Sequence, residues 1–215
     1  MAVKLPNGAT VALATAYGSA KTISAITNAN PGVASSTGHG FTDSDIIEVV
    51  SGWTRINERV YRVDSAATDN FALEGQDTSD TTAYPAGSGA GTAREITTWT
   101  QIAQITEFST SGGDMQFANY SFMESDNENQ LPTQASAMSI TMTIADDPSL
   151  AGYIALKAAA EARAKRALKL TLPDGSVILY NGYVSFNETP TLTKGSIMTV
   201  SATFSLQGKP VRYTA

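Results

Sequence analysis

The chain has 215 residues, of which 42% are hydrophobic and 16% charged, with no cysteine and a formal net charge of −6. This composition is typical of a folded globular protein, and the lack of cysteine excludes disulfides, thiolate metal sites and cysteine nucleophiles. The first residues do not resemble a secretory signal and no run of 18 apolar residues occurs, so we expect no membrane segment and synthesis in the cytoplasm.

The negative charge is concentrated in one long segment. No lysine or arginine occurs between Arg94 and Lys157, whereas acidic residues occur throughout. Because nucleic-acid binding requires cations that displace condensed counterions, a surface built from this segment would repel DNA rather than bind it tightly. A solvated acidic face that keeps the protein in solution is the simpler interpretation.

The first third of the chain is rich in short strand-like runs. Residues 3–27 contain two of them, TVALATAY and KTISAIT. Four more follow in residues 28–97, in PGVASSTGHGF, DIIEVVSG, ERVYRVDSA and NFALEG, each bounded by glycine, asparagine or aspartate. This regular spacing of short strands predicts a small all-β module inserted at 28–97. The module ends in the glycine-rich segment AYPAGSGAGTARE, which we interpret as a linker.

Longer strands are predicted after residue 98. The run TWTQIAQITEF reads as one strand with a bulge near Gln101, and MSITMTI as a half-buried strand with a small, uncharged polar face. A helix is predicted next, with Asp146 and Asp147 as its N-cap and a Glu161–Lys165 pair on its surface. The hairpin LTLPDGSVILYNGYVSF and the alternating strand SIMTVSATFSL complete the chain.

These elements predict a mainly β fold. Two sheets with one apolar face each, and one helix to cover an open end, make a β-sandwich with one flanking α-helix. In domain terms, residues 1–27 and 98–215 form the β-sandwich, and residues 28–97 form the inserted small β module.

Residues 110–133 combine acids and amides with bulky apolar side chains and show no sustained period. Such a segment is too polar to fold alone and too apolar to stay free, so we expect it to order on a partner. A local hairpin packed on the same chain is the alternative. The candidate inter-subunit residues are Asp114, Met115, Phe117, Tyr120, Phe122, Met123, Glu124, Asp126 and Glu128.

No residue pattern indicates catalysis, so the sequence predicts that the protein is not an enzyme. His39 is the only histidine and cannot form a histidine metal cluster. The segment GSGAGTA lacks the order of a phosphate-binding loop, and no nucleophile elbow occurs. We therefore predict no catalytic residue, no metal and no cofactor. Trp53 and Tyr61 are candidates for sugar stacking on the surface of the module, although such residues more often belong to a core.

Residues 98–210 resemble the major tail tube protein of lambda-like long-tailed bacteriophages (siphophages). The order of the elements carries the resemblance, and its most specific parts are the helix, KLTLPDGSV, GYVS and the closing LQGKP. The resemblance implies a β-sandwich that self-assembles into hexameric rings, stacked into the tube through which phage DNA is ejected. It further implies a loop, here 110–133, that orders between subunits and rings, and a negative lumen that lets DNA pass without tight binding.

The same resemblance implies the location and partners of the protein. It would belong to the virion tail and be made in the host bacterial cytoplasm. Its partners would be further copies of itself, the tape measure protein, the tail terminator and tail tip proteins, with the module at 28–97 on the exterior of the tube and no contact with a membrane. Three alternatives share parts of these features: a tail terminator, a head decoration protein, and a carbohydrate-binding adhesin-type protein.

Overall fold

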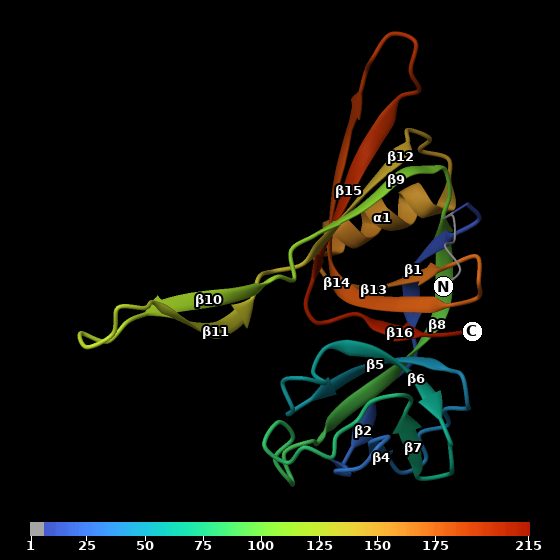
Figure 1. Ribbon diagram of the computed structural model, residues 1–215. Coiled ribbons are helices and arrows are strands. Elements are labelled where there is room, and N and C mark those ends of the chain that lie inside the picture. Colours follow the sequence, from blue (N-terminus) through green and yellow to red (C-terminus); the bar gives the residue numbers. More distant parts are fainter. Residues whose placement is uncertain (1–6) are drawn as a thin grey trace.

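The computed structural model describes residues 7–215, so the first residues of the predicted segment 1–27 lie outside it. Figure 1 shows a β-rich body with one helix and two projecting hairpins. The strands are β1 (Thr10–Tyr17), β2 (Lys21–Ile23), β3 (Ala25–Ile26), β4 (Val33–Ser35), β5 (Ile46–Ser51), β6 (Arg59–Asp64), β7 (Asn70–Leu73), β8 (Gly91–Ile102), β9 (Ile105–Ser111), β10 (Met115–Tyr120), β11 (Asn129–Ala135), β12 (Ser139–Ala145), β13 (Lys165–Thr171), β14 (Val177–Thr191), β15 (Thr199–Leu206) and β16 (Val211–Tyr213), and the helix is α1 (Ala151–Ala162). The predicted mainly β class with one helix is confirmed.

The two layers of the body belong to one curled sheet. Fourteen strands are joined, in the order β3-β4-β7-β6-β5-β8-β1-β13-β14-β15-β12-β9, with β16 added on β14 and β2 on β8. The sheet curls so that β9, β12 and β15 lie across α1 from β1 and β13 (Figure 1). Leu156 of α1 is fully buried in the same apolar cluster as Met142 of β12 and Phe204 of β15. The helix therefore fills the inside of the curl.

Strand β14 joins the two layers. Its first half pairs with β13 up to Tyr183, and from Gly182 onward it pairs with β15. At this change of partner the strands approach so closely that an added Cβ at Gly182 would lie 2.2 Å from the carbonyl oxygen of Ser205. A residue without a side chain is therefore required at this point.

The predicted helix N-cap is wrong. Asp147 Oδ1 accepts hydrogen bonds from the backbone N–H of Ser149 (3.0 Å) and from its hydroxyl (2.6 Å), which makes a separate turn before the helix. The N-cap position belongs to Leu150, with no side-chain cap. The Glu161–Lys165 pair is also wrong, because Arg163 adopts a left-handed φ of 48° that ends the helix and places Lys165 in β13.

Two further expectations about the backbone are wrong. The run TWTQIAQITEF forms two strands, β8 and β9, separated by Gln104 at a φ of 58°, and the register shifts opposite β8 occur around Ala16 instead of near Gln101. The glycine-rich segment is packed instead of serving as a free linker. Gly89 lies against the ring of Trp53, and an added Cβ at Gly91 would lie 1.9 Å from the carbonyl oxygen of Val50.

Strands β2–β7 surround a second apolar cluster that contains Trp53, Tyr61 and Phe71. A third cluster, with Ala14, Val60 and Tyr213, lies between this cluster and the one around α1. Strand β8 runs through both regions, since its first part pairs with β2 and β5 and its second part with β1. The predicted boundary at 97/98 falls inside this strand, and the division of the chain into two domains stays a prediction.

The crowding at Gly182 gives a test of the fold. We expect Gly182→Ala to lower the free energy of unfolding by about 1–3 kcal/mol, because the new methyl group collides with the backbone of β15. Gly18→Ala is the matched control, since an added Cβ there meets atoms only at ordinary distances of 3.7–3.8 Å. Urea unfolding of both variants measures the difference. Equal stabilities would show that β14 and β15 are not in the contact described.

Candidate functional site

The most prominent surface feature is a hairpin, residues 114–136, that we call the arm. Its strands β10 and β11 pair only with each other, and every residue of both strands is exposed. Figure 1 shows the arm standing clear of the body. The segment that we expected to order on a partner already forms two strands in the single chain, and its ordering on a partner stays a prediction. The alternative, a hairpin packed on the same chain, is correct about the hairpin but wrong about the packing.

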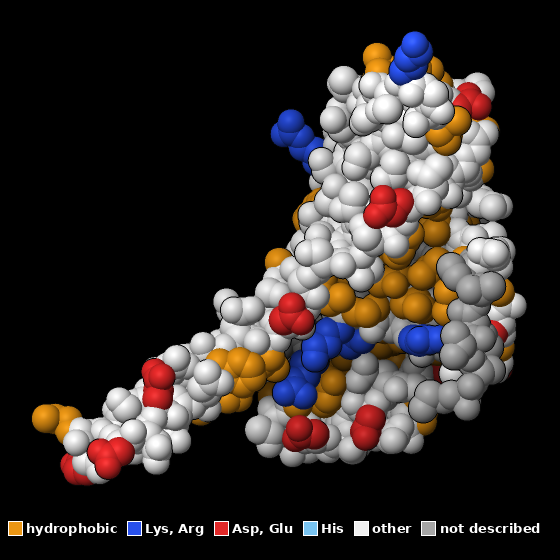
Figure 2. All heavy atoms as spheres, turned by 45° about the horizontal axis from the view of Figure 1, so that its top comes forward, with side chains coloured by type: hydrophobic (Ala, Val, Ile, Leu, Met, Phe, Trp, Pro, Cys, Tyr) orange, Lys and Arg blue, Asp and Glu red, His pale blue; other side chains and the backbone are white. Residues whose placement is uncertain are grey.

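All nine predicted inter-subunit residues lie on the arm or at its tip. The apolar ones are exposed in the single chain, from 43% for Tyr120 to 104% for Met123, and Leu131 joins them at 59%. The rings of Tyr120 and Phe122 contact each other edge to face, with centroids 5.5 Å apart. Glu124, Asp126 and Glu128 are exposed at the turn of the hairpin. Figure 2 shows these hydrophobic and acidic side chains side by side along the arm.

The arm is joined to the body by a glycine pair. Gly112 and Gly113 have φ values of 81° and 89°, and the backbone N–H of Ser136 donates to the carbonyl oxygen of Asp114 at 2.8 Å. An added Cβ at Gly112 would lie 1.9 Å from the carbonyl oxygen of Ala137. The two glycines therefore let the chain leave β9 and return to β12 through a narrow neck.

Four strands of the body form a patch with two open edges. The order is β14-β15-β12-β9, and each neighbouring pair is antiparallel. Strand β9 is the last strand of the sheet, and beyond Tyr183 strand β14 pairs only with β15 among the described residues. Unpaired edges of this length offer a ready template for another chain.

The face of this patch directed away from α1 consists almost entirely of hydroxyl side chains. The register aligns three rows across β9, β12, β15 and β14, because directly paired residues share a face of the sheet. The rows are Ser111–Ser139–Ser205–Tyr183, Ser109–Thr141–Thr203–Ser185 and Glu107–Thr143–Ser201–Asn187. We call this surface the hydroxyl face. Glu107 is its only charged residue within these rows.

The loop between β14 and β15 carries a second group of exposed apolar side chains. Leu192, Ile197 and Met198 are exposed by 72%, 65% and 50%. Figure 1 shows this hairpin projecting from the body in a direction different from that of the arm. Its exposed apolar surface was not predicted as a functional site, because Ile197 and Met198 were assigned to the alternating strand SIMTVSATFSL. In the structure this strand begins only at Thr199.

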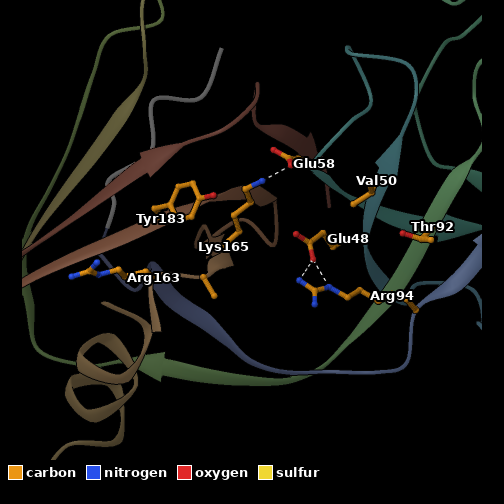
Figure 3. Close-up of a pocket in the computed structure, with 10 residues that line it drawn as sticks. Glu48, Val50, Glu58, Thr92, Arg94, Arg163, Lys165 and Tyr183 are labelled. Carbon is orange, nitrogen blue, oxygen red and sulfur yellow. Dashed lines mark hydrogen bonds and ion pairs between the residues drawn. The ribbon is translucent and has the colours of Figure 1, made fainter. Parts of the chain in front are cut away.

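A pocket of about 400 Å³ lies where the β2–β7 region meets the rest of the body (Figure 3). We call it the junction pocket. Glu48 of β5 pairs with Arg94 of β8, and Glu58 pairs with Lys165 of β13. The hydrogen bond to the Glu58 carboxylate raises the pKa of Lys165. Sequence reasoning missed this site, since its residues are far apart in the chain.

The predicted sugar-stacking residues are not on the surface, so that prediction is wrong. Trp53 is 2% exposed, and its indole N–H donates to the carbonyl oxygen of Pro85 at 2.8 Å. Tyr61 is fully buried, and burial raises the pKa of its hydroxyl. Both rings complete the apolar cluster of the β2–β7 region. Tyr61 lies on β6 and Trp53 in the bend after β5, and the sequence did not show that both positions would be covered.

His39 has a structural role. Its Nδ1 accepts the backbone N–H of Phe41 at 2.9 Å, so the ring proton lies on Nε2, 2.7 Å from the carbonyl oxygen of Ala67. Within residues 7–215, no group of three His, Asp or Glu side chains is arranged to hold a metal ion. No helix in this part of the chain has the length and apolar character needed to cross a membrane.

Three solved structures align with about half of the chain. The baseplate of the anti-feeding prophage aligns with a TM-score of 0.39 and 10% identity, over 55% of this chain and 86% of that chain. The tube-terminating cap of the same prophage aligns with a TM-score of 0.35 and 19% identity, over 54% of this chain and 83% of that chain. The sheath–tube complex of an extracellular contractile injection system aligns with a TM-score of 0.34 and 14% identity, over 50% of this chain and 80% of that chain. No curated protein matches the chain.

The family model described as phage tail tube protein, TTP, matches residues 51–215. The match begins at the end of β5, so it includes part of the predicted inserted module as well as the arm, the hydroxyl face and the strands that carry the sequence resemblance. The chain belongs to the phage tail tube protein family.

Proposed function

We propose that this protein forms hexameric rings that stack into the tail tube of a lambda-like phage, the conduit for DNA ejection. The observation that carries the proposal is the four-stranded patch with two open edges. The opposite end of the sheet, β3, is only two residues long, which is how proteins avoid unwanted pairing. The long open edges at β9 and the distal half of β14 are therefore the surfaces available for assembly.

The strand directions fit closure into a ring. Neighbouring strands of the patch are antiparallel, so β9 and β14, at its two edges, run in opposite directions. In a ring with rotational symmetry, β9 of one copy then lies antiparallel to β14 of the next. Pairing around the ring makes a closed barrel and removes both edges.

The hydroxyl face would line the lumen of this barrel, except at Tyr183, which lies beside the β2–β7 region. Its opposite face is occupied by α1 and the apolar cluster, which leaves the hydroxyl face as the only broad surface of the patch free to meet DNA. Serine and threonine hydroxyls offer no cation to displace phosphate counterions, and Glu107 repels phosphate. The arm acids lie away from this face, so Glu107 is the proposed source of negative lumen charge.

The arm would connect one ring to the next. Its exposed apolar side chains have no partner surface in the single chain, and large apolar side chains are the usual anchors of an interface. The tube would meet the tape measure protein, the tail terminator and tail tip proteins, and the β2–β7 region would lie on the exterior of the tube.

Removing the arm is expected to separate assembly from folding. Deletion of 114–136 joins Gly113 to Ala137 and leaves a four-residue loop between the paired residues Ser111 and Ser139, a length that hairpins accept. The variant should unfold cooperatively at the temperature of the intact protein, because the arm buries nothing on the body. Negative-stain microscopy of the concentrated protein should show tubes for the intact chain and none for the variant. Normal tubes from the variant would refute the role of the arm.

Reversing the charge of the lumen is expected to affect DNA passage more than assembly. In Glu107→Lys, each subunit adds a cation to the lumen, and DNA should be held in a salt-dependent manner. Phage carrying this variant should form tails of normal appearance but eject DNA less completely, with recovery at higher salt. Asp64→Asn is a control for loss of an acidic charge outside the lumen, since Asp64 is exposed at the end of β6. Wild-type ejection by Glu107→Lys phage would place Glu107 outside the lumen.

A further inference from the structure

Exposed apolar side chains of the body are concentrated at the junction pocket. Outside the arm and the β14–β15 hairpin, the large hydrophobic residues exposed by more than a third among those described are Val50, Ile154 and Tyr183. Two of these three, Val50 at 45% and Tyr183 at 38%, line the junction pocket. They lie on different walls, since Val50 belongs to β5 and Tyr183 to β14 (Figure 3). The pocket therefore offers an apolar contact from both sides.

The pocket also has an excess of positive charge. Its two carboxylates are matched, with Glu48 bound to Arg94 and Asn181, and Glu58 bound to Lys165. Arg163, at the rim, has no ion pair within the described residues, and it extends away from the two matched pairs in Figure 3. Figure 2 shows Lys and Arg side chains gathered on the body beside hydrophobic surface near the base of the arm. An incoming carboxylate would therefore find one free guanidinium.

The tip of the arm has the complementary chemistry. Phe122 and Met123 are exposed by 63% and 104%, and Glu124 follows them directly. No lysine or arginine lies between Arg94 and Lys157. The carboxylates of Glu124, Asp126 and Glu128 form no ion pair within the described residues. The tip thus combines apolar anchor residues with carboxylates that have no ion-pair partner within the described residues.

We propose that the arm tip of one copy seats in the junction pocket of another copy. Phe122 and Met123 enter between Val50 and Tyr183, and Glu124 pairs with Arg163. The arm points away from the body that carries it (Figure 1), so the pocket it fills belongs to a different subunit. Apolar anchors that fill a pocket are the usual centre of an interface hot spot, and a charged pair at the rim favours the correct partner and orientation. This inference rests on the proposed tube assembly and names its receiving site.

In this arrangement the β2–β7 region takes part in assembly. One wall of the pocket, with Val50, Glu48 and Glu58, comes from that region, and the other comes from the body. The arm would therefore bind only where the two parts are correctly joined. Each copy contributes one arm and one pocket, so the contact is heterologous and can propagate from copy to copy.

Disulfide trapping tests the contact directly, because the chain has no native cysteine. In the double variant Met123→Cys with Val50→Cys, oxidation of assembled tubes should give a ladder of covalent oligomers on a non-reducing gel. The control pairs Met123→Cys with Thr68→Cys, an exposed position at another pocket, and should give no ladder. Tubes without a ladder from the first variant would overturn the docking site while leaving the tube intact. If the intact chain forms no tubes, the proposed function fails and the docking site fails with it.

A charge exchange provides the second test. Arg163→Glu and Glu124→Arg should each lower the fraction of protein that sediments as tubes, and the double variant should recover it. Arg55→Glu is the matched control, since this cation lines a different pocket. Failure of the double variant to recover, with both single variants folded by circular dichroism, would contradict the Glu124–Arg163 pair.

Discussion

Strand β14 pairs with β13 through its first half and with β15 through its second, and Gly182 marks the change of partner. Both layers of the curled sheet depend on this one strand. The absence of a side chain at Gly182 lets β15 approach, and the alternation of β15 then buries Val200, Ala202 and Phe204 while it exposes serine and threonine. The apolar core and the hydroxyl face are therefore two sides of the same strand pairing.

The residue next to this change of partner also holds the β2–β7 region in place. Asn181 precedes Gly182 and is 4% exposed. Its side-chain amide donates to Glu48 Oε1 at 2.8 Å and to the carbonyl oxygen of Glu58 at 3.0 Å. Buried polar groups that bond across a boundary fix the relative position of the two parts. The change of partner in β14 thus fixes the distance between the junction pocket and the open edge of the patch. A fixed distance is needed if every copy in an assembly makes the same two contacts.

Features set by local pattern were predictable from the sequence. The alternation in β12 and β15 gave their buried faces, Asp174 and Gly175 gave the turn of the β13–β14 hairpin, and the composition of 110–133 gave the candidate anchors. The helix start was not predictable, because the Asp147–Ser149 turn competes with an N-cap for the same side chain. The burial of Trp53, the rows of the hydroxyl face and the junction pocket depend on register and on contacts between distant segments. One sequence carries no direct signal for these.

The central claim is that β9 of one subunit pairs with the distal half of β14 of the next to close a barrel lined by the hydroxyl face. The most direct test is a cryo-electron microscopy reconstruction of tubes formed by the purified protein. It should show antiparallel β9–β14 hydrogen bonds between neighbouring subunits, with Glu107 facing the lumen. Tubes in which β9 remains an unpaired edge, or in which the hydroxyl face is directed outward, would contradict the account.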